Sequence, residues 1–189
     1  MNTDYLVLVN EDNALPENYE KNIKLVSYIS ELGEKFIIEE KTLKAFLALK
    51  EDLLKKDNIQ AELISVYRSV PEQVETFERY VRSFGEEYAN KYVAKPGYSE
   101  HHTGLAIDVG IVLGGKLYRT VEEMISIDEL YLTVQSKLAR YGFILRYPKG
   151  KEHITKIGYE PWHFRYIDSP EIAKEITDKG ITMEEYFGK

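Results

Sequence analysis

The chain has 189 residues, of which 43% are hydrophobic, and this length and composition predict one compact domain over residues 1–189. Its net charge of −7 predicts no general attraction to nucleic acid or to anionic lipid. It contains no cysteine, which excludes disulfides, thiolate metal sites and a cysteine nucleophile.

The first residues lack the features of a targeting segment. Met1 to Tyr5 carries no basic side chain, and the apolar run from Leu6 to Val9 is far shorter than the core of a signal peptide. No stretch approaches the roughly 20 apolar residues that a membrane span needs. We therefore expect no membrane span and a cytoplasmic location, unless a leader precedes this sequence.

The first half of the chain is predicted to contain a strand between two helices. The expected segments are an irregular lead-in with short extended pieces over 1–40, a helix over 39–57 and a strand over 61–67. Ser69, followed three residues later by Glu72, is typical of a helix start. Arg68 is therefore predicted to lie between a strand and a helix N-terminus, where anion sites are often built.

The second half is predicted to mix strands and helices without regular alternation. The expected segments are strands over 105–113, 143–147 and 162–167, and helices over 128–141 and 169–180. Gly114-Gly115 predicts a hairpin turn directly after the first of these strands. This order favours an α+β fold with a small, mostly antiparallel sheet flanked by helices over a doubly wound fold.

Asp108 is the only charged residue in the apolar strand predicted over 105–113. Burying a carboxylate among apolar residues is costly unless a metal or another cation compensates its charge. A turn at Gly104 would fold His101 back over Asp108, because glycine adopts such turns at little cost. Zinc in a hydrolase typically has three protein ligands and an open fourth position, so this pair predicts part of a metal site.

Glu160 and His163 form a second charged cluster. Pro161 excludes the helical His-Glu-x-x-His arrangement, so Glu160 is predicted in a turn and His163 on the strand that follows. If His163 binds a metal, Glu160 lies one step away as a general base. The residues alone leave another interpretation equally open, in which His163 is a core histidine and Glu160 a solvated turn residue.

These residues resemble a known family. The signature of the zinc D-alanyl-D-alanine carboxypeptidases is similar to two runs in this chain, Ser99-x-His101-x-x-Gly104-x-Ala106-x-Asp108 and Glu160-x-x-His163. That family includes the VanY, VanX and VanXY enzymes of vancomycin resistance. Tyr67-Arg68-Ser69 and the segments 141–148 and 159–166 also resemble VanY and VanXY sequences. The resemblance spans roughly residues 60–168 and implies the α+β fold of LAS and Hedgehog-type zinc peptidases.

The resemblance implies a role for each residue of the predicted site. It implies that His101, Asp108 and His163 bind Zn²⁺. It also implies that Glu160 is the catalytic base and that Arg68 stabilises charge on the scissile carbonyl oxygen.

Three further residues are expected to bind substrate: Ser99 and Gln73 from the resemblance, and Trp162 from its place between Glu160 and His163. Ser99 and Gln73 would recognise the free C-terminal carboxylate of the substrate, and Trp162 would form a wall of the pocket. Simpler interpretations remain open for each: a turn cap, a helix-surface residue and a core residue, respectively. The other two histidines are expected outside the ligand set, His102 either exposed or behind the ligands and His153 solvated.

The implied function is a zinc peptidase that removes the terminal D-alanine from peptidoglycan precursors ending in D-Ala-D-Ala, with hydrolysis of the free dipeptide left open. The nearest alternative is an L,D-carboxypeptidase acting on tetrapeptides, and a second is a non-catalytic zinc-binding module. Glu160 and Arg68 argue against the module, because a structural metal site needs neither a base nor an oxyanion donor. The sequence does not predict the oligomeric state or the choice between these substrates.

Overall fold

The computed structural model describes residues 3–188, and a five-stranded antiparallel sheet lies at their centre. Four strands are neighbours in the order β3 (Gln60–Ser65), β4 (Ala106–Leu113), β7 (His163–Tyr166) and β6 (Phe143–Leu145), and the short β5 (Lys116–Tyr118) pairs with β4. β4 and β5 are joined through the predicted Gly114-Gly115 turn. The small antiparallel sheet expected from the sequence is confirmed.

Successive side chains of β4 point to opposite faces of the sheet. Ile107, Val109 and Ile111 are buried in the main hydrophobic core. Asp108 lies between them in the chain and therefore points to the opposite face, which lines a cleft. The apolar character of β4 and its one charge thus belong to different faces of the same strand.

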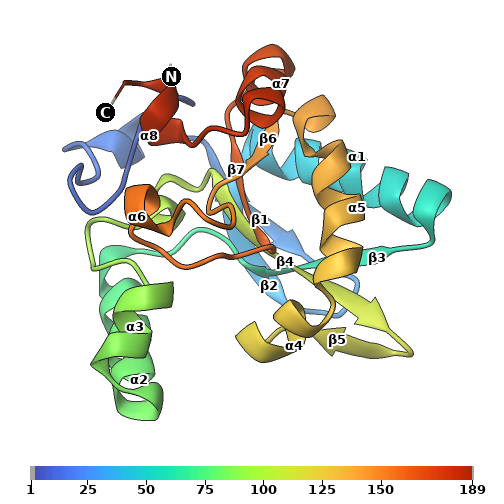
Figure 1. The fold of residues 1–189 in the computed structure, drawn as a ribbon, viewed down its shortest axis with the longest axis horizontal. Helices are drawn as coiled ribbons and strands as arrows, with labels where there is room; N and C mark the ends of the chain where they lie inside the picture. Colours follow the sequence, from blue (N-terminus) through green and yellow to red (C-terminus); the bar gives the residue numbers. More distant parts are fainter. Residues whose placement is uncertain (1–2, 189) are drawn as a thin grey trace.

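Two long helices supply the main core on one side of the sheet (Figure 1). α1 (Glu40–Asp57) buries Phe46, Leu49 and Leu53, while α5 (Asp128–Leu138) buries three side chains at helical spacing, Tyr131, Val134 and Leu138. α5 continues as the 3₁₀ helix η3 (Ala139–Tyr141), which ends at Gly142 with a φ of 74°. α7 (Pro170–Lys179) packs against β6 through a smaller core. These helices were predicted from apolar periodicity and end signals.

Helices α2 (Val70–Phe84) and α3 (Glu86–Tyr92) form an arm that stands away from the sheet (Figure 1). α2 begins with the predicted capping box of Ser69 and Glu72. Its apolar face does not enter the main core, because Gln73 is its only fully buried residue and Phe84 is 56% exposed. The arm instead forms one wall of the cleft.

The lead-in is more ordered than the sequence predicted. β1 (Leu25–Ile29) and β2 (Lys35–Glu39) form a two-stranded hairpin after the 3₁₀ helix η1 (Tyr19–Lys21). Further short helices are η2 (Glu100–Thr103), α4 (Val121–Ser126), α6 (Glu152–Thr155) and α8 (Met183–Tyr186). None of the helices found within residues 3–188 has the length and apolar character needed to cross a bilayer.

Candidate active site

The register between β4 and β7 places Asp108 directly opposite His163. Side chains of such a cross-strand pair lie close together on one face of the sheet. The Asp108 Oδ1 atom accordingly lies 2.9 Å from His163 Nδ1. Sheet pairing therefore joins two residues that are 55 positions apart in the sequence.

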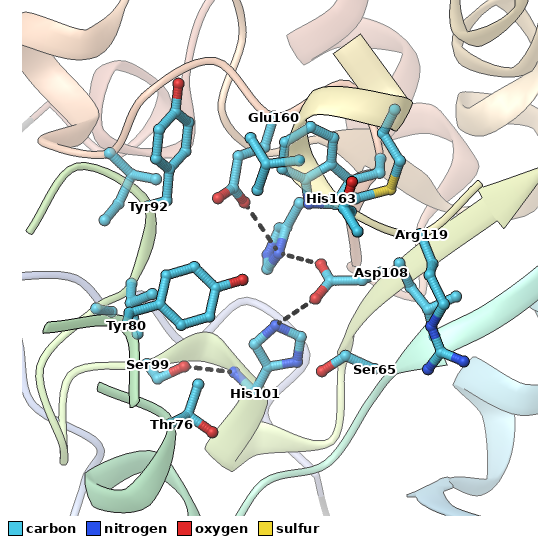
Figure 2. A pocket seen from close by; sticks show the side chains of 18 of the residues that line it. Ser65, Thr76, Tyr80, Tyr92, Ser99, His101, Asp108, Arg119, Glu160 and His163 are labelled. Carbon is cyan, nitrogen blue, oxygen red and sulfur yellow. Dashed lines mark hydrogen bonds and ion pairs between the residues drawn. The ribbon is translucent and has the colours of Figure 1, made fainter. Parts of the chain in front are cut away.

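His101 reaches the same carboxylate from the 3₁₀ helix η2, and its Nε2 atom lies 3.3 Å from Asp108 Oδ2 (Figure 2). Gly104 ends η2 with a φ of 69°, and a Cβ at this position would lie 2.9 Å from Leu25 Cδ2. Both facts require glycine here. The predicted turn that folds His101 over Asp108 is therefore present.

Glu160 and Arg68 complete the charged cluster. Glu160 lies in the turn before β7, and its Oε2 atom is 3.6 Å from His163 Nδ1 (Figure 2). Arg68 follows β3, and its Nη2 atom is 3.9 Å from Asp108 Oδ2. Its guanidinium donates hydrogen bonds to Gln73 Oε1 (2.7 Å) and Ser65 Oγ (2.9 Å). A cation beside Asp108 and a potential base beside His163 thus border the same cluster.

Burial and neighbouring charges set the protonation of these groups. Burial lowers the pKa of His101 to about 4, and the charge of Arg68 acts in the same direction. Burial raises the pKa of Glu160 to about 8, aided by Asp108. Burial opposes a charge on His163, yet the nearby carboxylates of Asp108 and Glu100 raise its pKa to about 9. His101 is therefore uncharged at neutral pH. The carboxylates around His163 favour a positive charge at that place in the cluster.

These donors fit a divalent metal ion. One ligand atom from each of His101, Asp108 and His163 lies within 4.8 Å of the other two. The Nδ1 atom of His101 donates to Val66 O at 2.7 Å, which leaves the Nε2 lone pair directed at the site. Two imidazoles and one carboxylate are a ligand set that suits zinc and leaves a position open.

The predicted substrate-binding residues line the cleft beside this cluster. Ser99 is buried and its Oγ atom accepts a hydrogen bond from His101 N, so it caps η2 and also faces the cleft. Gln73 is fully buried rather than on the helix surface, because it accepts from Arg68 and donates to Ala94 O at 2.6 Å. Trp162 is 4% exposed and belongs both to the main core and to the cleft wall.

The cleft has a volume of about 530 Å³ and one aromatic wall. The wall consists of four side chains of the arm in mutual contact, Tyr80, Phe84, Tyr88 and Tyr92. Figure 2 shows the Tyr80 hydroxyl directed into the space between Glu160, Asp108 and His101. Tyr88 donates a hydrogen bond of 2.9 Å to Glu122 on α4, which connects the two sides of the cleft.

A buried ionic network behind the cluster was not predicted from the sequence. Glu100 accepts from Arg146 Nε at 2.8 Å and from Arg165 Nη1 at 2.7 Å. Arg146 also donates to both carboxylate oxygens of Glu184 on α8. Burial opposes the charge of Glu100, but the two arginines hold its pKa well below its usual range.

The two remaining histidines differ in their surroundings. His102 is buried, donates from Nδ1 to Arg68 O at 2.6 Å and accepts at Nε2 from Gly97 N at 3.0 Å. Of the two expectations for His102, exposure is therefore wrong, and a place behind the ligands agrees with these bonds. His153 is exposed as predicted, although it lies on α6 rather than in a turn.

Residues 35–169 match the family model described as VanY, D-alanyl-D-alanine carboxypeptidase. The chain belongs to this family. The putative carboxypeptidase YodJ of Bacillus subtilis (strain 168) is 40% identical over 97% of this chain and 67% of YodJ. The bifunctional D-Ala-D-Ala dipeptidase and carboxypeptidase VanXYC of Enterococcus gallinarum is 34% identical over 98% of this chain and 94% of VanXYC.

Solved structures of similar carboxypeptidases share the fold. The E175A mutant of the vancomycin resistance D,D-pentapeptidase VanY, in complex with Zn(II), superposes with a TM-score of 0.80 at 30% identity, over 97% of this chain and 98% of that one. VanYB in complex with D-alanine-D-alanine gives a TM-score of 0.81 at 30% identity, over 98% of both chains. The LD-carboxypeptidase LdcB gives a TM-score of 0.74 at 37% identity, over 98% of this chain and 86% of LdcB. The recognised family and the α+β fold are both confirmed.

Proposed function

We propose that this chain is a zinc D,D-carboxypeptidase that removes the terminal D-alanine from peptidoglycan precursors ending in D-Ala-D-Ala. The observation that carries the proposal is the convergence of His101, Asp108 and His163 at the floor of one cleft, with Glu160 and Arg68 beside them. Similar enzymes whose structures contain Zn(II) or D-alanine-D-alanine support the same metal and substrate. The cytoplasmic location expected from the sequence stays a prediction, which cell fractionation would test.

The chain's own residues supply the proton transfers. Zinc held by His101, Asp108 and His163 would act as a Lewis acid that polarises the scissile carbonyl and makes water more acidic. Glu160 acts in its ionised form, which the positive charge of Arg68 favours, and accepts the proton of the attacking water. The water oxygen bonds to the carbonyl carbon, and Glu160 passes the proton to the nitrogen as the C–N bond breaks. The products are free D-alanine and a peptide shortened by one residue.

Arg68 stabilises the negative charge that the carbonyl oxygen gains during the attack. Its two anchoring hydrogen bonds, to Gln73 and Ser65, fix the guanidinium before substrate arrives. A preorganised donor of this kind costs no reorganisation at the moment of reaction. The charge of Arg68 persists because arginine is not deprotonated in proteins.

We assign recognition of the substrate carboxylate to Ser99 and an indirect role in the same pocket to Gln73. Ser99 Oγ accepts a hydrogen bond from His101 N, so its hydroxyl proton is available to a ligand. Gln73 acts by holding Arg68, because its carboxamide bonds to Arg68 and to Ala94 O. Trp162 closes the wall beside them.

An L,D-carboxypeptidase is the second candidate. The 37% identity to the LD-carboxypeptidase LdcB exceeds the 30% identity to VanYB, although the VanYB superposition has the higher TM-score. Both activities use the same metal ligands and base in this proposal, so they differ only in the residue accepted before the scissile bond.

The test is D-alanine release by the purified, zinc-loaded protein from three substrates: UDP-MurNAc-pentapeptide, the corresponding tetrapeptide and D-Ala-D-Ala. Release from the pentapeptide is the expected result, and release from D-Ala-D-Ala would add dipeptidase activity. Release from the tetrapeptide alone would replace the proposal by the L,D activity. No release from any substrate, with zinc shown to be bound, would contradict both and favour the non-catalytic module.

A further inference from the structure

Two polar atoms near the metal ligands are buried without a hydrogen-bond partner within residues 3–188: Glu100 Oε2 and His163 Nε2. They lie 3.6 Å apart. A buried polar group without a partner is costly, and native structures contain few of them. Two such atoms that face each other therefore indicate a contact that shortens when the site is complete.

The other nitrogen of His163 already faces the ligand cluster. His163 Nδ1 lies 2.9 Å from Asp108 Oδ1 and 3.6 Å from Glu160 Oε2. A metal bound between His101, Asp108 and His163 would therefore meet Nδ1 of the His163 ring. Nε2 then carries the proton and needs an acceptor, because a neutral imidazole has one donor and one acceptor nitrogen.

Glu100 is held in the position of that acceptor. Both hydrogen bonds from the arginines, Arg146 Nε at 2.8 Å and Arg165 Nη1 at 2.7 Å, go to its Oε1 atom. Its Oε2 atom is left free toward His163. Arg146 is held in turn by Glu184, so the carboxylate cannot turn away without breaking a buried network.

We propose that Glu100 is a positioning residue of the metal centre: its carboxylate, clamped by Arg146 and Arg165, accepts the Nε2 proton of His163 and directs Nδ1 at the ion. The inference rests on the proposed zinc site. His101 has the corresponding support from a backbone carbonyl, Val66 O, at 2.7 Å. The 3₁₀ helix η2 thus contributes one ligand, His101, and through the preceding residue orients the other histidine.

The test compares zinc affinity in Glu100→Gln and Glu184→Gln, measured by competition with a chromophoric chelator. Each variant removes one negative charge from the same arginine, Arg146, but only Glu100 faces His163. Glu100→Gln is expected to weaken zinc binding about 10–100-fold, the usual effect of losing a carboxylate that orients a ligand. Glu184→Gln leaves the Glu100–His163 contact and the bond from Arg165 to Glu100 in place, so it is expected to change the zinc affinity much less.

The Co²⁺-substituted proteins give a second measurement. The visible d–d spectrum reports ligand geometry, so it is expected to change in Glu100→Gln and not in Glu184→Gln. Equal zinc affinities and equal spectra in the two variants would overturn the proposal. A wild-type protein that binds no zinc would instead contradict the proposed function itself.

A third measurement needs no variant and covers the case in which Glu100→Gln does not fold. Long-range ¹H–¹⁵N correlation spectra of the zinc-loaded wild type identify which ring nitrogen of each histidine carries a proton. The proposal expects His163 to be protonated at Nε2 and to bind through Nδ1. Protonation at Nδ1, with Nε2 bound to the metal, would overturn it.

Discussion

Arg68 is a fixed cation at the edge of the metal cluster, held by Gln73 and Ser65. Arg68→Ala removes the group assigned to the carbonyl oxygen, and the loss of one oxyanion donor typically lowers kcat about 10²–10³-fold. We expect a fall of this size in D-alanine release, with zinc content unchanged. Arg68→Lys is the matched control for charge, and we expect it to restore only part of the rate because lysine lacks the two-pronged anchoring. Full activity in Arg68→Ala would refute the assigned role.

Tyr80 directs its hydroxyl into the space between Glu160, Asp108 and His101 (Figure 2). No hydrogen bond of this hydroxyl is found within residues 3–188, so it is available to a substrate. Tyr80→Phe is expected to lower kcat/KM about 2–13-fold, the range that one neutral hydrogen bond of about 0.5–1.5 kcal/mol gives. Tyr92→Phe is the control, because its hydroxyl points away from the cluster in the same view. Equal effects of the two substitutions would count against a role for the Tyr80 hydroxyl.

The cost of burying a charge predicted a partner for Asp108, and the same cost applies to Arg146 and Arg165. As the only charge in an apolar strand, Asp108 was predicted to have a compensating metal or cation. Its neighbours in the structure are His101, His163 and Arg68. Arg146 and Arg165 are also charges beside strand hydrophobics, and both are fully buried. The cost of burying a charge would have predicted an acidic partner for them, although the sequence does not say that Glu100 is that partner.

Among the elements, the arm of α2 and α3 differs most from the rest of the fold. α2 fully buries only Gln73 and α3 only Ala89, whereas α1 buries Phe46, Leu49 and Leu53 in the core. Few buried contacts mean a low free energy of local opening. We expect amides of α2 to exchange with deuterium faster than those of α1, as measured by hydrogen-exchange mass spectrometry. Slower exchange in α2 than in α1 would show that the aromatic wall is more rigid than its burial indicates.

Sequence patterns predicted some of the helices and strands but not others. α1, α5 and α7 were predictable because apolar periodicity, the start signal Ser169-Pro170 and the end signal Gly142 agree. The β1–β2 hairpin was predicted only as short extended pieces, since the exposed Ile29 and Ile37 hide the alternation between buried and exposed residues in the sequence. The placement of α2 was missed for another reason: an apolar helix face looks the same in sequence whether it meets the core or a cleft.

At the scale of the molecule, the network Glu100–Arg146–Glu184 joins the active site to the C-terminal helix α8. Burial opposes the charge of Glu184, but Arg146 and Asn10 hold its pKa below its usual value of about 4.3. A lowered pKa in the folded state stabilises the fold above the unfolded pKa, and this stabilisation is lost as pH falls through the folded pKa.

Glu184→Gln is therefore expected to lower the free energy of unfolding at pH 7 by about 3 kcal/mol, as for a buried pair that loses one partner. The difference from wild type is expected to narrow as pH falls below the unfolded pKa of about 4.3 and to be lost as pH falls through the lower pKa of the folded state. Urea unfolding of both proteins at several pH values between 7 and 3 measures this difference in the free energy of unfolding. A difference that stays constant over this range would exclude a linked titration of Glu184.

Glu160 gives the most direct test of the account, because a metal site of purely structural role needs no buried carboxylate in this place. The measurement is D-alanine release from UDP-MurNAc-pentapeptide by zinc-loaded Glu160→Gln and wild type, with zinc content determined in both. We expect equal zinc content and a loss of at least about 10²-fold in rate, the lower end of what a general base contributes. Unchanged release by a fully zinc-loaded Glu160→Gln protein would contradict it.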